Sequence, residues 1–145
     1  MALTINSFHD GNLTSVEVGE GTAALGLKHL DGRRFSFKLA GVEALSINDF
    51  REGNIVLGLH EVTGPQFEAT GFSPGDIRAS LHLLFTPPHP DAAQSYHDDH
   101  NALLDRQVER LRSGAMRLVI LDPAHGADLL AFCASTRLIA LDISG

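Results

Sequence analysis

Residues 2–62 alternate between apolar and polar side chains with a period of two, and turn-forming residues interrupt the pattern at short intervals. Successive side chains of a strand point to opposite faces of a sheet, so this alternation predicts half-buried strands. The clearest example is residues 34–39, preceded by Asp31-Gly32, a sequence typical of a tight hairpin turn. Strands are predicted at residues 2–8, 13–18, 22–29, 34–39, 42–47 and 54–62. Hairpin-length connections between them indicate an antiparallel meander.

The second half of the chain changes to helical spacing. Ser73, Pro74 and Asp76 are typical of a helix start, because serine caps the first N–H groups, proline suits the first turn and aspartate faces the positive end of the helix dipole. A second helix is predicted over residues 91–113, with Gly114 as its end. A strand at 117–121, a short helix at 126–135 and a strand at 137–143 complete the prediction.

These elements predict an α+β fold in which an N-terminal antiparallel β-meander packs against two or three C-terminal helices. The 145 residues suit a single domain, with a β-rich part at 1–62 and a mixed part at 73–143. One cysteine, Cys133, cannot form an intrachain disulfide, which fits a reducing compartment. No basic start with a short apolar run and no stretch of about 20 apolar residues is present, so we expect a cytoplasmic protein without membrane contact.

The net charge of −7 favours some partners and disfavours others. An acidic surface repels phosphate backbones, and the basic residues are scattered along the sequence, so nucleic acid is not expected as a partner. Steering by opposite charge favours a basic protein partner instead. Exposed edge strands would also permit a homodimer.

Gly71-Phe72-Ser73-Pro74-Gly75 matches the G-x-S-x-G elbow that carries the nucleophile of α/β-hydrolases. In that elbow the backbone N–H of the residue after the serine helps to form the oxyanion hole. Here that residue is Pro74, which has no N–H. We therefore interpret Ser73 as a helix cap. Cys133, within an apolar run, is interpreted as a core residue.

Eight histidines are many for this length, and four of them, His82, His89, His97 and His100, lie within 19 residues of the sequence. His97 and His100 are three residues apart on the predicted helix, so both could reach one metal ion, and zinc or a similar divalent metal is the cofactor this would imply. The apolar stripe of that helix places His100 near its centre, which equally predicts a histidine packed in the core. Without the metal site we expect no cofactor.

Three segments carry a resemblance: Phe-His-Asp-Gly at 8–11, Ala-Gly-Val-Glu-Ala-Leu at 40–45 and Asn-Asp-Phe-Arg-Glu-Gly-Asn-Ile-Val at 48–56. The pattern resembles a diffuse group of small bacterial proteins of unknown function, some of which look like immunity proteins of contact-dependent toxin systems. The resemblance covers about half of the chain. It implies a bacterial cytosolic protein and assigns no chemistry to any residue.

Three functions follow from these observations. The leading hypothesis is a non-catalytic binding or interaction protein, immunity-like, because each catalytic pattern meets a physical objection. The first alternative is a metal-dependent hydrolase that uses His97 and His100. The second is a small-ligand-binding domain with a groove between the sheet and the long helix, where Tyr96, His100 and Phe35 would converge.

Overall fold

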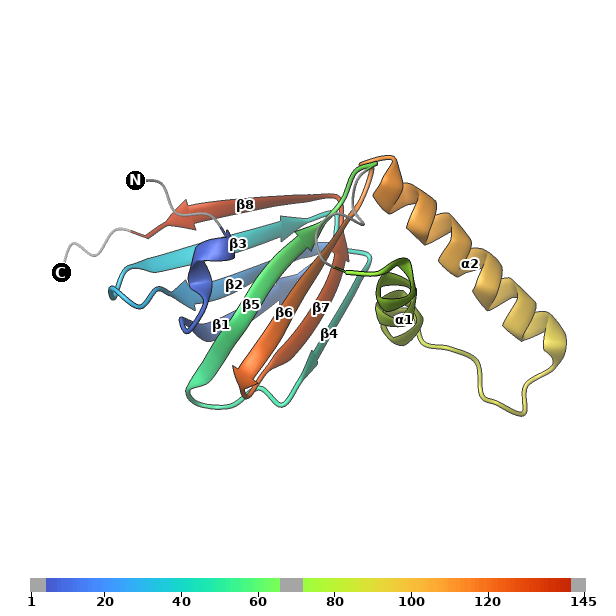
Figure 1. The fold of residues 1–145 in the computed structure, drawn as a ribbon, viewed down its shortest axis with the longest axis horizontal. Helices are drawn as coiled ribbons and strands as arrows, with labels where there is room; N and C mark the ends of the chain where they lie inside the picture. The colour runs from blue at the N-terminus through green and yellow to red at the C-terminus, as the bar shows by residue number, and fades with distance from the viewer. Residues whose placement is uncertain (1–4, 66–71, 142–145) are drawn as a thin grey trace.

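A computed structural model of the chain describes residues 5–65 and 72–141. Eight antiparallel strands dominate it (Figure 1). The strands are β1 (Asn12–Gly19), β2 (Thr22–Lys28), β3 (Arg34–Ala40), β4 (Ala44–Asn48), β5 (Asn54–Val62), β6 (Arg117–His125), β7 (Asp128–Cys133) and β8 (Ser135–Ala140). The helices are the 3-10 helix η1 (Ile5–Phe8) and the α-helices α1 (Pro74–Leu84) and α2 (Gln94–Arg112).

The predicted fold class, an N-terminal meander packed against two or three C-terminal helices, is wrong. The strand order is β4-β7-β6-β5-β1-β2-β3-β8, so the three C-terminal strands lie among and beside the N-terminal ones. Strand residues make up 44% of the structure and helical residues 25%, which makes it a sheet-dominated fold. The sheet is therefore built from both halves of the sequence.

The main source of this error is the apolar run at residues 126–135, which was predicted as a helix and forms β7. Leu129 and Ala131 face one core, whereas Leu130 and Phe132 face another. A strand that is buried on both faces has no polar alternation, so its pattern does not distinguish it from a buried helix. The N-terminal strand was also wrong where the structure describes it, because Ile5–Phe8 is a 3-10 helix. Residues 2–4 lie outside the described part.

Other expected elements are confirmed. Ser73 caps α1 in a reciprocal capping box: its hydroxyl accepts a hydrogen bond from the Asp76 N–H, and the Asp76 carboxylate accepts one from the Ser73 N–H. On β3 the side chains of Phe35, Phe37 and Leu39 are buried, as their alternation predicted. The long helix ends at Arg112, before Gly114.

The sheet curls on itself because two long segments of paired strand, β3–β4 and β7–β8, bend together. β3 pairs with β8 and β4 pairs with β7, so β3–β4 and β7–β8 are two bent strands that remain paired across the bend. The bend lies at Gly41, which has a φ of 61°, opposite Ala134. The Ala134 N–H donates to the Ala40 and Gly41 carbonyls at 3.0 and 3.2 Å. With β1 pairing both β2 and β5, the strand pairings close into a ring.

Two hydrophobic cores result. The inner core lies inside the curled sheet and includes Phe8, Leu25, Phe37, Val119, Leu121, Leu129 and Cys133. The outer core lies between the sheet and the helices and includes Val62, Ile77, Leu81, Leu104, Leu118, Ile120 and Phe132. Strand β6 supplies side chains to both cores, which accounts for the uninterrupted burial of residues 118–121.

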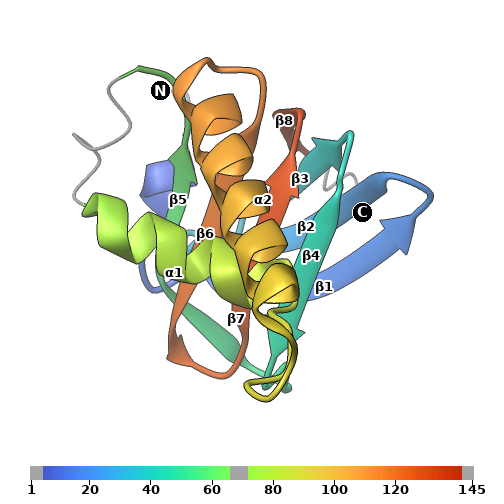
Figure 2. The ribbon, with the colours of Figure 1, turned by 90° about the vertical axis from the view of Figure 1, so that its right-hand side faces the viewer.

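Both helices cover the same side of the sheet (Figure 2). They lie over β6 and β7, and neither covers the outward face of β1, β2 and β3 (Figure 1). No helix in the described residues combines the length and apolarity that a membrane span requires. Within the part of the chain that the structure describes, the outward face of β1–β3 has no helix over it.

Candidate functional site

The predicted metal ligands lie on α2 beside α1. His100 is 9% exposed, and its Nε2 lies 3.0 Å from Nδ1 of His82 on α1. Burial, and the nearby charges of His82, Arg78 and His97, lower the pKa of His100 below its usual value. The inward orientation of His100 is thus confirmed, and its nearest polar partner is a histidine of the other helix.

This histidine cluster offers few ligands for a metal. Within residues 5–65 and 72–141, no group of three His, Cys, Asp or Glu side chains is placed to hold a metal ion. A catalytic zinc site ordinarily has three protein ligands. The metal-dependent hydrolase therefore stays a prediction and gains no support from this geometry.

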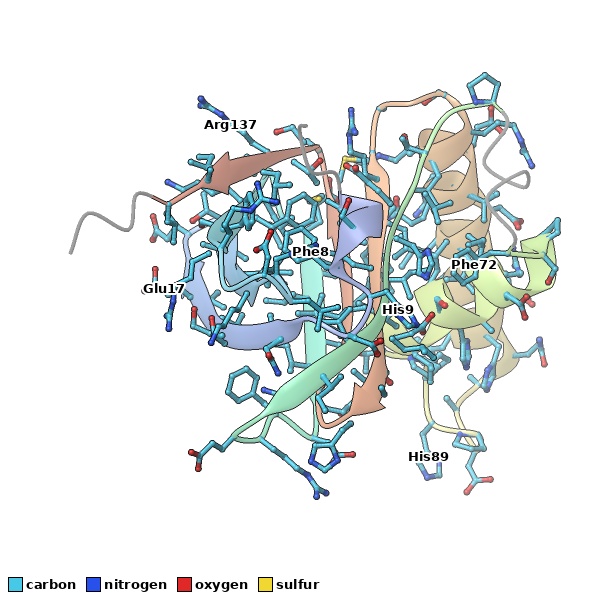
Figure 3. The ribbon with its side chains drawn as sticks, turned by 60° about the vertical axis from the view of Figure 1, so that its left-hand side comes forward. Phe8, His9, Glu17, Phe72, His89 and Arg137 are labelled. Atoms are coloured by element: carbon cyan, nitrogen blue, oxygen red, sulfur yellow. The ribbon has the colours of Figure 1, made fainter. Side chains whose placement is uncertain are left out.

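The predicted ligand groove of Phe35, Tyr96 and His100 is not assembled by the described residues. Phe35 lies in the inner core, where its ring meets Phe8 edge to face at 5.3 Å. Figure 3 shows Phe8 within the curled sheet. Tyr96 is 63% exposed on α2, on the other side of the sheet. The inner core thus separates Phe35 from the helix layer that contains the other two.

Cys133 is a core residue, as interpreted from the sequence, and lies beside an ion pair. Its side chain is fully buried, and burial, together with the charge of Glu61, raises the pKa of its thiol to about 11 although Arg117 acts in the opposite direction. Glu61 accepts hydrogen bonds from Arg117, at 2.9 Å, and from the Thr136 hydroxyl. The thiol is therefore protonated at neutral pH, a state unsuited to a nucleophile.

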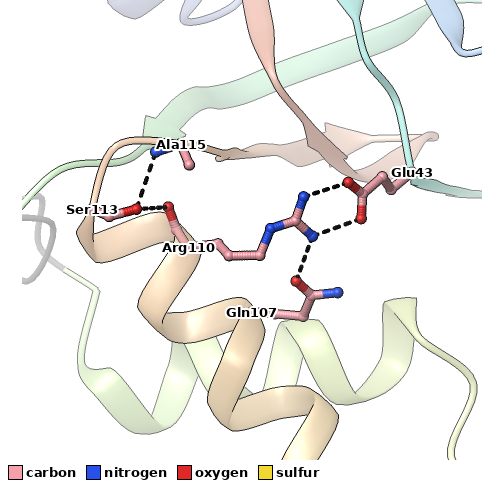
Figure 4. A network of polar contacts seen from close by, with 5 residues as sticks. All are labelled: Glu43, Gln107, Arg110, Ser113 and Ala115. Carbon is pink, nitrogen blue, oxygen red and sulfur yellow. Dashed lines mark hydrogen bonds and ion pairs between the residues drawn. The ribbon is translucent and has the colours of Figure 1, made fainter.

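A second polar network attaches α2 to the bend of the sheet (Figure 4). Arg110 donates two hydrogen bonds to the Glu43 carboxylate, at 2.6 and 2.8 Å, and one to Gln107 at 2.9 Å. The Arg110 bond and charge lower the pKa of Glu43, although partial burial opposes them. This bidentate pair fixes the helix against the sheet and is structural.

The strongest candidate site is a hollow of about 550 Å³ on the side of the sheet away from the helices. It lies where β1 begins, β2 ends and β3 begins, beside the loop before β5. Its wall contains three cations, one carboxylate and one aromatic ring: Lys28, Arg34, Arg51, Glu52 and Phe50. Its volume lies in the range of small-molecule sites.

The cations of this hollow have no carboxylate partners in the part of the chain that the structure describes. Lys28 and Arg34 are directly opposite each other in the β2–β3 pairing, and neither forms an ion pair within the described residues. The same holds for the Arg51 side chain. Like charges placed directly across a strand pair are destabilising. In a chain with a net charge of −7, this local excess of positive charge is the opposite of what the composition suggests.

Asn54 holds the loop of the hollow in place. It is 2% exposed, and its Oδ1 accepts hydrogen bonds from the N–H groups of Arg51, at 2.7 Å, and Ala127, at 3.0 Å. Its Nδ2 donates to the Leu13 carbonyl at 3.2 Å. One buried amide thus connects the loop of Phe50 and Arg51 to β1 and to the turn between β6 and β7, so the hollow is preformed.

The sequence analysis missed this site because its cations come from three separated segments. One signal was available: the Asp31-Gly32 turn places Lys28 and Arg34 near each other at the start of one hairpin. Their direct pairing depends on the three-residue loop at 30–32, since a two-residue turn would place Lys28 opposite Phe35. Arg51 joins them only through the buried contacts of Asn54, which no local pattern indicates.

In comparisons with known proteins, no family model, no curated protein and no solved structure matches the chain.

Proposed function

We propose that the protein is a non-catalytic binding domain for an anionic ligand, bound in the hollow of Lys28, Arg34 and Arg51. The observation that carries the proposal is the cross-strand couple Lys28 and Arg34 beside a third cation, none of which has a carboxylate partner among residues 5–65 and 72–141. A bound anion would relieve the repulsion between the two opposed cations. Arginine can in addition hold a carboxylate or phosphate through two parallel hydrogen bonds.

Two features support binding without catalysis at this site. Among the described residues that line the hollow there is no histidine, cysteine or serine, and the one carboxylate, Glu52, is exposed. General acid–base catalysis needs a group with a pKa suited to proton transfer, held next to the ligand. The immunity-like protein with a basic partner and the metal-dependent hydrolase stay predictions, and the hollow favours neither.

Titration of the protein with inorganic phosphate and with succinate, followed by calorimetry or by amide chemical shifts, tests the proposal. We expect saturable binding that weakens as salt is added, because exposed charges are screened. The variant Arg34→Gln is expected to bind at least about tenfold more weakly, the value of one lost charge-assisted hydrogen bond.

Lys38→Gln is the matched control for that variant. Lys38 lies on the same strand and the same outward face as Arg34 but does not line the hollow. Its substitution should leave the affinity within about twofold, as expected for a surface change outside the site. Equal losses in both variants, or no binding of either anion, would contradict the proposal.

A further inference from the structure

A second hollow adjoins the cationic one. It has a volume of about 430 Å³, and it shares Thr14 and Phe50 with the first. The rest of its lining comes mainly from apolar side chains: Val16, Val18 and Ile47. The two hollows therefore meet at Thr14 and Phe50. The first is cationic and lies on the outward face of the sheet, and the second is apolar, with Val16 and Ile47 also packed against the inner core.

The second hollow lies between two strand edges that lack partners. Within the described residues, β4 pairs only with β7, and residues 15–19 of β1 pair only with β2. Ile47 comes from β4, and Val16 and Val18 come from β1. The second hollow thus crosses the gap between these two edges, where Val18 is exposed and Val16 and Ile47 are half-buried.

Two side chains of the second hollow are unusually exposed for their type. Val18 is 68% exposed and Phe50 is 47% exposed. Leaving apolar surface in water is unfavourable, by about 25 cal/mol for each Å². A ligand with an alkyl chain would remove this surface from water while its charged end meets the cations.

We infer that the anionic ligand is an acyl carboxylate, whose carboxylate lies between Lys28, Arg34 and Arg51 and whose alkyl chain lies along Val16, Val18 and Ile47. The inference rests on the proposed function and deepens it by naming the class of ligand. Phe50 lies at the junction of the two hollows and contacts the first carbons of the chain. The preformed loop, held by Asn54, keeps the ring at that junction.

A series of linear carboxylates from acetate to octanoate, titrated by calorimetry, tests the inference. Burial of each added methylene should tighten binding by about twofold to fourfold, the upper value applying to complete burial. Octan-1-ol, which has the same chain without the charge, should bind at least about tenfold more weakly than octanoate. An affinity that does not change between acetate and octanoate would overturn the inference.

Two equally exposed side chains provide the variant and its control. Val18→Ser should flatten the dependence of affinity on chain length while leaving acetate binding unchanged. Leu30→Ser serves as the control, because Leu30 is 69% exposed and does not line either hollow. An equal effect of both substitutions would also overturn the inference.

The same titrations separate the two proposals. If acetate and phosphate bind, and Arg34→Gln weakens both, but chain length has no effect, the acyl carboxylate is refuted and the anion site stands. If no carboxylate and no phosphate binds, the proposed function fails and the inference fails with it.

Discussion

The side-chain oxygen of Asn54 accepts a hydrogen bond from the backbone N–H of Ala127, 73 positions later in the sequence. The same oxygen accepts a hydrogen bond from the Arg51 N–H, and the side-chain nitrogen of Asn54 donates one to the Leu13 carbonyl. Replacing Asn54 by alanine removes three hydrogen bonds to backbone groups, two of them buried and one partly buried, and should lower the free energy of unfolding by about 3 kcal/mol. Urea denaturation measures this loss.

Asn48→Ala is the control for that prediction, because Asn48 is exposed at the end of β4. Its effect should stay within about 0.5 kcal/mol. An Asn54→Ala variant as stable as Asn48→Ala would show that the connections made by this amide are not required.

Two glycines with similar backbone angles should differ in their tolerance of alanine. Gly41 and Gly53 have φ angles of 61° and 77°, so both substitutions introduce backbone strain of about 1–2 kcal/mol. A Cβ at Gly41 would also lie 2.6 Å from the Ala134 Cβ, whereas nothing lies within 4 Å at Gly53. Gly41→Ala should therefore destabilise the protein by at least about 1 kcal/mol more than Gly53→Ala in urea denaturation. Equal losses of stability in the two variants would mean that the bend at Gly41 accommodates the added methyl group without further destabilisation.

The contact between Glu43 and Arg110 should contribute modestly to stability. Both side chains are about 40% exposed, so a double-mutant cycle with Glu43→Gln and Arg110→Gln should give a coupling of about 0.5–1 kcal/mol at neutral pH. Since the pKa of Glu43 is lowered in the folded state, its contribution is present above the unfolded pKa and lost as the pH falls through the folded pKa. Repeating the cycle at a pH of about 3 should reduce the coupling. A coupling that persists at this pH would contradict the assignment.

His100 should make stability fall on acidification. Its pKa is lowered in the folded state, chiefly by burial, so the unfolded state binds more protons as the pH decreases from about 7 to about 5. The stabilisation is complete above the unfolded pKa and is lost as the pH falls through the folded pKa. His100→Leu should weaken this pH dependence in urea denaturation, and the exposed His89→Gln should keep it. If both variants keep the pH dependence of stability that the unsubstituted protein shows, a group other than His100 causes that dependence.

Cys133 should react with thiol reagents only when the protein unfolds. Its side chain is fully buried and its thiol pKa is about 11, so about a thousandth of the thiol is ionised at pH 8. Iodoacetamide should modify one cysteine promptly in concentrated urea and hardly at all in buffer, as counted by mass spectrometry. Prompt modification in buffer would show that the inner core opens locally.

The sequence predicted best the elements whose signals are local. Examples are the alternation on β3, the Ser73 cap and the inward orientation of His100. Each is indicated by residues only a few positions apart in the sequence. The strand β7 was missed because its two faces meet two different cores, a fact that only the complete fold determines. The cationic hollow was missed for the same reason, since Arg51 reaches Lys28 and Arg34 through tertiary contacts.

The pairing of β3 with β8 has a consequence during synthesis of the protein. Ala40 pairs with Ser135, so one edge of β3 has no partner until a further 95 residues have left the ribosome. At 5–20 residues per second this interval lasts roughly 5–20 seconds. During it the nascent chain presents an open strand edge with apolar neighbours, a template for association with other chains. The translation rate between the two strands therefore sets how long this strand edge stays unpaired in the nascent protein.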